Sequence, residues 1–478
     1  MTDPSSVSWR PTPGRSRPAR SPALIALVVL AVVAIGAGGL RLGDAVGPEP
    51  LRIGAVFPIS GNAASLAGPE LEGVRIAADL VNADGGIAGR PIELVVRDLR
   101  ARSEADPVMA DLAAQGIRIV IGAYSSDLSI AASEAADRAG LVYWEAGAVA
   151  DRLTGQELPR VFRVGTTGGN LGRNSAEFAA AELARRLGKE PSELRIALAV
   201  AEDEYTRAVA DAAEATARER GLQVVARRSY NLAVPDWPAV MADLAAARPD
   251  VIILASHIPD GIAFRQAMLA AGLRVGALIG STMAECDPDF AGVLGPDAIG
   301  IFASDRPTAG FQPSVLRAEA AEAYARFAPR WADAASRDGG EGDTHGGGYG
   351  GGGEDRYGGS DYVIFGPDQD ATAEESEEAL AGFSAAWALF RHVLPSIDPA
   401  GTDPFAADAV AAAARAMDLP DGSLPNGAGL RFSTDPTKLG QNERAAAVIW
   451  QWQAERTYAF VWPPSYRTGE VGFVPLER

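Results

Sequence analysis

The feature that most constrains the fold is an alternation of short apolar runs with amphipathic segments, which begins at residue 51. The runs 51–57 ("LRIGAVF") and 92–98 ("IELVVRD") have the length and composition of buried strands, and the segment between them has apolar residues at helical spacing. Those apolar residues are Leu71, Val74, Ala78 and Val81. Strands that are joined through helices pair in parallel. We therefore predict an α/β protein with doubly wound, Rossmann-like sheets.

The same alternation occurs a second time between residues 194 and 282. A chain of 478 residues exceeds a single hydrophobic core, and two successive sets of strands and helices indicate two lobes of like architecture. The segment 161–174 ("VFRVGTTGGNLGRN") lies between the two sets. We interpret it as the first crossing from one lobe to the other.

The N-terminal region has the pattern of an export signal. Four arginines precede the uncharged residues 21–40, which end at Arg41. The arginines are Arg10, Arg15, Arg17 and Arg20. Because the run is just long enough to span a bilayer, both cleavage near Gly43 and Ala45 and retention as an anchor stay open. We expect residues 1–48 to be an export signal or membrane anchor that places the rest of the chain outside the cytoplasm.

Composition excludes several classes of function. The chain has 62 Asp and Glu against 43 Lys and Arg, and no Lys/Arg-rich block beyond the N-terminal region, so we expect no nucleic-acid partner. Cys286 is the only cysteine, which rules out an intramolecular disulfide, a lipid-modified cysteine after the apolar run and a cysteine-based zinc site. We expect neither a metal nor another cofactor.

Glycine dominates one internal segment. Twelve of the 23 residues from 338 to 360 are glycine, and apolar side chains there are few. Such a composition cannot offset its ordering entropy, so we predict a flexible inserted loop over residues 336–376. His345 and its acidic neighbours leave a metal site as the alternative, and we favour the solvated loop.

The sequence lacks recognisable catalytic motifs. A nucleophilic serine needs a base within reach and a strained turn, yet no Gly-x-Ser-x-Gly motif occurs. His257 is the histidine that follows a predicted strand. The metalloprotease His-Glu-x-x-His motif, the phosphate-binding loop and the EF-hand loop are missing as well. We therefore expect a protein that is not an enzyme.

Polar loops recur at the carboxyl ends of the predicted strands, where doubly wound sheets bind ligands. One of them holds Tyr124, Ser125 and Ser126 and leads into a predicted helix, whose first N–H groups are unpaired. The serine hydroxyls and these N–H groups could hold a carboxylate through hydrogen bonds of about 1.5–3 kcal/mol each. The alternative is that the serines only cap the helix.

Several stretches resemble the branched-chain amino-acid (Leu/Ile/Val) type of periplasmic binding protein, the extracytoplasmic solute receptor of ABC importers. They are 51–98, 119–133 ("IVIGAYSSDLSIAAS"), 140–154 ("GLVYWEAGAVADRLT"), 264–273 and 440–471. The resemblance covers most of residues 51–478 apart from the glycine-rich insert. It implies the type I clamshell, in which two lobes are joined by three crossing strands and close on a small solute.

The resemblance also implies how the chain divides between the lobes. The first lobe comprises residues 51–164 and 305–440, including the insert, and the second comprises residues 165–304 and 441–478. The disulfide that the family has in its first lobe is absent, because neither matching region contains a cysteine.

In the first lobe, the resemblance assigns ligand contacts to two loops. Ser126 matches the serine that fixes the ligand carboxylate, and Tyr124 and Ser125 lie beside it. In the next loop Gly147 and Ala148 match the family. Val149 stands where the family has threonine, so one hydroxyl is lost.

In the second lobe, Tyr205 matches an aromatic residue that packs on the ligand, and His257 falls where the family has tyrosine. The acid that neutralises the ligand's ammonium is replaced at Thr282, and the nearest acid is Glu285. A buried ammonium without an anionic partner is costly. Unless Glu145 or Glu285 substitutes, we expect an aromatic or aliphatic carboxylate or a small amide rather than a standard amino acid.

Three functional hypotheses follow. The first is a monomeric solute-binding protein of an ABC importer, which binds a small amino acid or carboxylate-type solute between the lobes and delivers it to the membrane permease. The second is a membrane-anchored sensor domain of the same fold. The third is a serine hydrolase that uses Ser126 and His257, whose side chains then have to lie within about 3 Å. We favour the first, on the periplasmic or extracellular face of the membrane.

Overall fold

The computed structural model describes residues 48–61, 63–281, 288–308, 310–338, 376–401, 403–455 and 457–476. By its internal contacts the chain divides into residues 1–49 and 50–478, and the second unit is described below. The predicted signal or anchor, residues 339–375 of the glycine-rich insert, Thr282, Glu285 and Cys286 lie outside the described residues. The loop predicted over 336–376 starts too early, because residues 336–338 still belong to a helix. Within the described ranges, none of the helices combines the length and the apolar composition that a membrane span requires.

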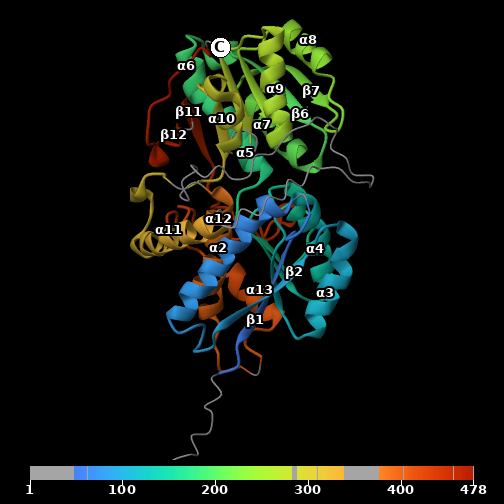
Figure 1. The fold of residues 1–478 in the computed structure, drawn as a ribbon, viewed down its shortest axis with the longest axis vertical. Coiled ribbons are helices and arrows are strands. Elements are labelled where there is room, and N and C mark those ends of the chain that lie inside the picture. Colours follow the sequence, from blue (N-terminus) through green and yellow to red (C-terminus); the bar gives the residue numbers. More distant parts are fainter. Residues whose placement is uncertain are drawn as a thin grey trace, which may run out of the picture. The chain divides into compact units, whose positions relative to one another are not determined.

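The first lobe is built on a parallel five-stranded sheet (Figure 1). Its strands are β1 (Leu51–Phe57), β2 (Ile92–Asp98), β3 (Ile119–Gly122), β4 (Val142–Glu145) and β5 (Val161–Arg163), in the order β2-β1-β3-β4-β5. Both strands predicted for the first βαβ unit are confirmed at their predicted bounds. The segment interpreted as the first crossing begins with β5, at the edge of this sheet.

Successive residues of the central strands face opposite layers of helices, as the pleat of a strand requires. Ile119 and Ile121 belong to the same core cluster as Leu71, and Val120 belongs to the cluster of Leu112. The first layer contains α2 (Ala64–Ala83), α11 (Ala318–Asp338), α12 (Glu377–Trp387) and α13 (Ala407–Arg415), and the second contains α3 (Ala105–Ala114) and α4 (Ser126–Arg138). The predicted apolar face of α2 is confirmed, since all four of its residues are buried.

The second lobe is built on a seven-stranded sheet of mixed direction (Figure 1). Its strands are β6 (Arg195–Ala201), β7 (Gln223–Tyr230), β8 (Val251–Ala255), β9 (Ala277–Ser281), β10 (Phe302–Asp305), β11 (Val448–Ala454) and β12 (Thr457–Trp462), in the order β12-β11-β10-β9-β8-β6-β7. The helices of this lobe are α5 (Gly168–Phe178), α6 (Ala184–Arg186), α7 (Glu204–Glu219), α8 (Trp237–Ala247), α9 (Ile258–Ala271) and α10 (Pro288–Leu294). Strand β10, which the sequence pattern did not indicate, pairs antiparallel with β11 and so brings the C-terminal hairpin into the sheet.

A buried polar network joins the end of the first sheet to the returning C-terminal segment. The Nε group of Arg163 donates to Oε1 of Gln441 at 2.6 Å, and the amide of Asn442 donates to the carbonyl oxygen of Val164 at 3.0 Å. Burial lowers the pKa of Arg163 to about 10, so the guanidinium is still charged at neutral pH. The exact division of the chain between the lobes remains a prediction.

Helices α2 and α12 lie side by side, although they are far apart in the sequence (Figure 1). A Cβ atom on Gly73 of α2 would lie 2.1 Å from the carbonyl oxygen of Ala379, and one on Gly382 of α12 would lie 2.0 Å from the carbonyl oxygen of Glu70. Glycine at both positions therefore lets the two backbones touch. This approach brings the first turn of α12 close to the carboxyl ends of the strands.

We predict that Gly73→Ala lowers the free energy of unfolding by about 1–3 kcal/mol, because the added methyl group must push α12 away. Asp79→Ala, on the exposed face of the same helix, is the matched control and is expected to change it by less than about 0.5 kcal/mol. Urea denaturation of both variants measures the difference. Equal effects would contradict backbone contact between α2 and α12.

Candidate functional site

The turn between β3 and α4 has the backbone geometry of a tight, strained loop. Tyr124 has a φ of 71°, in the left-handed region, and α4 begins two residues later at Ser126. The hydroxyl oxygen of Ser125 accepts a hydrogen bond from the N–H of Leu128 at 3.3 Å, so Ser125 caps the helix. The capping alternative therefore describes Ser125 well.

Ser126 connects this turn to the next loop of the first lobe. Its hydroxyl oxygen accepts a hydrogen bond from the N–H of Ala150 at 3.1 Å. The structure thus brings Ser126 together with the loop of Gly147, Ala148 and Val149, as predicted from the order of the strands. The hydroxyl keeps its own proton, which it can donate to a ligand.

Glu145 holds the loop of residues 145–150 from within. Its side chain is fully buried, and Oε1 accepts hydrogen bonds from the N–H groups of Ala146, Gly147 and Ala148 at 3.1, 2.9 and 2.9 Å. Its other oxygen accepts one from the hydroxyl of Tyr143 at 2.9 Å. Three successive N–H groups on one oxygen form an anion-binding nest that the chain fills itself. Glu145 is therefore engaged within the loop, and it is not a free partner for a ligand's ammonium.

Two predicted residues of the second lobe lie together. The rings of Tyr205, at the start of α7, and His257, which precedes α9, have their centroids 5.2 Å apart. His257 Nε2 lies 2.9 Å from Oδ2 of Asp203, and Nδ1 lies 3.6 Å from Oδ1 of Asp260. Burial opposes protonation of His257, but the hydrogen bond to Asp203 and the nearby carboxylate of Asp260 prevail and raise its pKa to about 10. At neutral pH this site presents an imidazolium.

The geometry does not support a Ser126–His257 dyad. Both nitrogens of His257 face carboxylates of the second lobe, and the hydroxyl oxygen of Ser126 is bonded within the first lobe. A cationic imidazole also cannot accept a proton as a general base. The arrangement is that of polar groups held for binding.

Two depressions lie outside these loops. One has a volume of about 400 Å³. Its lining residues are next in sequence to loop 145–150 and to Tyr205, and they are Asp151, Arg152, Glu204, Arg207, Ala208, Asp211 and Ala212.

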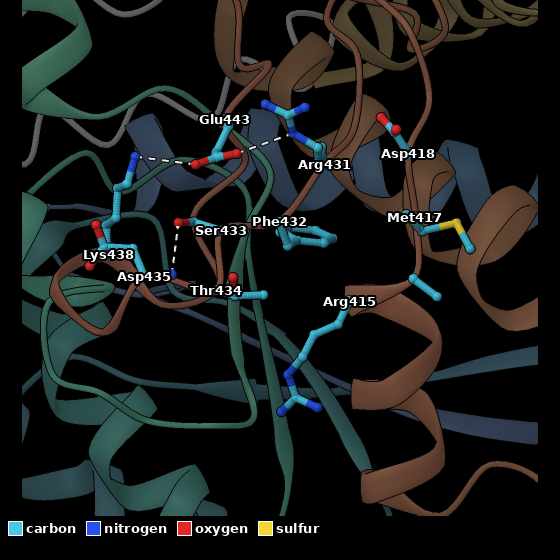
Figure 2. Close-up of a pocket in the computed structure, with 11 residues that line it drawn as sticks. Arg415, Met417, Asp418, Arg431, Phe432, Ser433, Thr434, Asp435, Lys438 and Glu443 are labelled. Atoms are coloured by element: carbon cyan, nitrogen blue, oxygen red, sulfur yellow. Dashed lines mark hydrogen bonds and ion pairs between the residues drawn. The ribbon is translucent and has the colours of Figure 1, made fainter.

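The other, of about 420 Å³, lies between the end of α13 and residues 431–443 (Figure 2). There Arg431 and Lys438 both pair with Glu443, at 3.1 and 3.2 Å. The second depression contains no residue that the sequence predicted for the site.

Several buried or partly buried polar residues next to the predicted loops were missed by the sequence reasoning. They are Glu70, Arg163, Asp203, Arg306, Glu377 and Glu378. Arg306 follows β10, and its Nη1 donates to the carbonyl oxygen of Gly147 at 3.0 Å. An arginine within an apolar segment indicates a buried charge, and this pattern could have identified Arg163 and Arg306. It could not have identified their partners, which come from distant parts of the chain.

Comparison with known proteins points to one family. The sequence profile described as periplasmic binding protein matches residues 50–351. The "Leu/Ile/Val-binding protein homolog 8" of Brucella abortus (strain 2308) is 28% identical over 408 residues, which are 84% of this chain and 88% of that protein. The "Leu/Ile/Val-binding protein homolog 7" of Brucella melitensis is 29% identical over 269 residues, which are 56% of this chain and 67% of that protein.

Solved structures confirm the fold. The branched-chain amino acid transporter substrate binding protein LivJ of Streptococcus pneumoniae, in complex with isoleucine, has a TM-score of 0.61 at 18% identity, covering 87% of this chain and 100% of that one. The leucine binding protein LivK of Thermotoga maritima has a TM-score of 0.61 at 16% identity, covering 86% and 97%. The predicted two-lobed α/β architecture of type I is therefore confirmed.

We predict that His257 stays protonated across the neutral range. With histidine at only three positions (257, 345 and 392), long-range 1H–15N spectra of histidine-labelled protein can follow each ring through a pH titration. His257 should not titrate between about pH 6 and 8, whereas burial lowers the pKa of His392, which serves as the internal control.

Asp203→Asn should bring the pKa of His257 down. Because the folded-state pKa lies above the unfolded value of about 6.5, the pair stabilises the fold fully below that pH and loses this effect as the pH rises towards about 10. The stability loss in Asp203→Asn should therefore be largest below about pH 6.5. A His257 signal that titrates near pH 6.5 in the unmodified protein would contradict the assigned ion pair.

Proposed function

This chain belongs to the periplasmic binding protein family, and from that membership we propose that it is the solute-binding protein of an ABC importer. Proteins of this family act outside the cytoplasm and are binding proteins, not enzymes. The proposal further holds that the chain binds a small amino acid or carboxylate-type solute and delivers it to a membrane permease.

One observation carries the proposal. The loop of Ser126 and the pair of Tyr205 and His257 lie at the carboxyl ends of strands of the two sheets, the position at which doubly wound sheets bind ligands. Tyr205 offers an aromatic face and His257 a positive charge, which together suit a solute with an apolar part and an anionic group. The relatives whose names state a ligand are named for leucine, isoleucine and valine.

The sensor hypothesis shares the fold, and it differs from the proposal in requiring a retained anchor. The N-terminal run that would form this anchor lies outside the described residues. The importer proposal therefore includes both a released and an anchored form of the same binding protein.

We predict that a thermal-shift screen of residues 50–478 identifies a solute among branched-chain and aromatic amino acids, their deaminated acids and short amides. A ligand at about 100 times its Kd stabilises the folded state by about 2.7 kcal/mol, which raises Tm. If none of these solutes shifts Tm and the protein instead hydrolyses an ester, the binding function is wrong.

Ser126→Ala should weaken binding of the identified solute by roughly tenfold, because a hydroxyl that bonds to a charged group contributes about 1.5–3 kcal/mol. Ser396→Ala is the matched control, since its hydroxyl bonds only to the carbonyl oxygen of Val393 near the end of a helix. Isothermal titration calorimetry of both variants gives the comparison. Unchanged affinity in Ser126→Ala would remove Ser126 from the ligand contacts.

A further inference from the structure

The backbone of loop 145–150 has few groups left for a ligand. The N–H groups of residues 146–148 donate to Glu145, and that of Ala150 donates to Ser126. The carbonyl oxygens of Gly147, Ala148, Val149 and Ala150 accept hydrogen bonds from Arg306, Arg163, Gly168 and again Arg163. A solute's charged group must therefore find its main partners elsewhere in the first lobe.

A cluster of charged side chains lies directly against this loop. We call it the Glu70 cluster, and it consists of Glu70, Tyr124, Arg306, Glu377 and Glu378. The carboxylate of Glu70 is so close to Gly147 that a Cβ atom there would lie 1.9 Å from Oε2. Arg306 lies 3.5 Å from Glu377 and 3.6 Å from Glu378, and it also holds the carbonyl oxygen of Gly147.

The cluster combines ion pairs with buried acceptors that lack a donor. Arg306 pairs with Glu377 and Glu378. Glu70 is fully buried, and neither of its side-chain oxygens has a hydrogen-bond partner among the described residues. The hydroxyl of Tyr124, a side chain that is 93% buried, likewise has none there, and its electrostatic neighbours are Glu378, Arg306, Glu70 and Glu377. Glu70 and Tyr124 therefore offer buried acceptor atoms that no donor among the described residues satisfies.

Building on the proposed importer function, we propose that the Glu70 cluster binds the cationic nitrogen of the solute. An ammonium group would donate to Glu70 and to the oxygen of Tyr124, the two buried acceptors of the cluster that lack a donor. The cluster reaches the surface at Glu378, whose side chain is 16% exposed.

The proposal accounts for the missing acid of the second lobe. The resemblance places the ammonium partner at Thr282, which is not an acid, and Glu145 is used within its own loop. Glu70 and Glu378 supply carboxylates on the first lobe instead. The anionic end of the same solute is then left to Ser126 and to the imidazolium of His257.

Binding should be accompanied by release of a proton. Burial, together with the charge of Glu145, raises the pKa of Glu70 well above its usual value, while Arg306 lowers it and Glu378 raises it. Without a cation beside it, Glu70 is therefore biased toward its protonated form. An ammonium beside it favours the carboxylate, so the Glu70 proton leaves to the solvent as the cation enters.

The test uses calorimetric titration of residues 50–478 with two series of three matched probes. The first is L-leucine, 4-methylpentanoate, which lacks the amino group, and 3-methylbutylamine, which lacks the carboxylate. The second is L-phenylalanine, 3-phenylpropanoate and 2-phenylethylamine. The protein variants are Glu70→Gln and Tyr124→Phe, with Glu93→Gln as the control because Glu93 is a carboxylate of the same lobe that pairs with Arg52 on the surface. Titration in two buffers of different ionisation enthalpy measures proton release.

We expect the amino acid to bind at least about tenfold more tightly than its deaminated acid, and Glu70→Gln to remove this difference. Tyr124→Phe should reduce it, Glu93→Gln should preserve it, and proton release should disappear in Glu70→Gln alone. Binding of the deaminated acid within about threefold of the amino acid would overturn the proposal while leaving the importer function intact. Failure of all six probes to bind would also overturn the proposal, whereas the importer function is wrong only if the wider solute screen fails and an ester is hydrolysed.

Discussion

The buried carboxyl group of Glu145 is the interaction on which the loop edge of the first lobe depends. A fully buried carboxyl group is tolerated only when its oxygens are hydrogen-bonded, and here three successive N–H groups and the hydroxyl of Tyr143 meet that requirement. These hydrogen bonds fix the conformation of the loop. They also occupy the N–H groups of residues 146–148, which could otherwise bind an anionic ligand. The polar groups left for a solute are side chains around the loop.

Two buried arginines, 143 residues apart in the sequence, complete this arrangement. Arg163 binds the carbonyl oxygens of Ala148 and Ala150, and Arg306 binds that of Gly147. Arg163 also donates to Gln441, so the position of the loop is tied to the segment that returns from the second sheet. Truncating one member of such a network leaves buried polar groups unpaired. Because Arg163 bonds both to the loop and to Gln441, we expect the loop and the connection between the lobes to behave as one structural unit.

Local patterns predicted much of the fold. Strands β1 and β2 and the buried face of α2 follow from apolar spacing within a few residues. The contact between Tyr205 and His257 was not predicted. Strand β10 was missed because the pairing that gives it a place in the sheet comes partly from β11, far along the chain. Glu70 was not predicted either. In the sequence it has the pattern of an ordinary polar residue of an amphipathic helix, and its burial depends on the packing of α12 against α2.

The sequence by itself determined the α/β class, the two lobes, the family and the loops that carry the candidate ligand contacts. These depend on short-range periodicity and on motifs whose residues are close together in the chain. Only the tertiary structure decided that Glu145 faces inward, that His257 is held as a cation by Asp203, and that Glu70, Tyr124 and Arg306 meet. Burial and charge pairing set these properties, and both depend on which distant segments pack together.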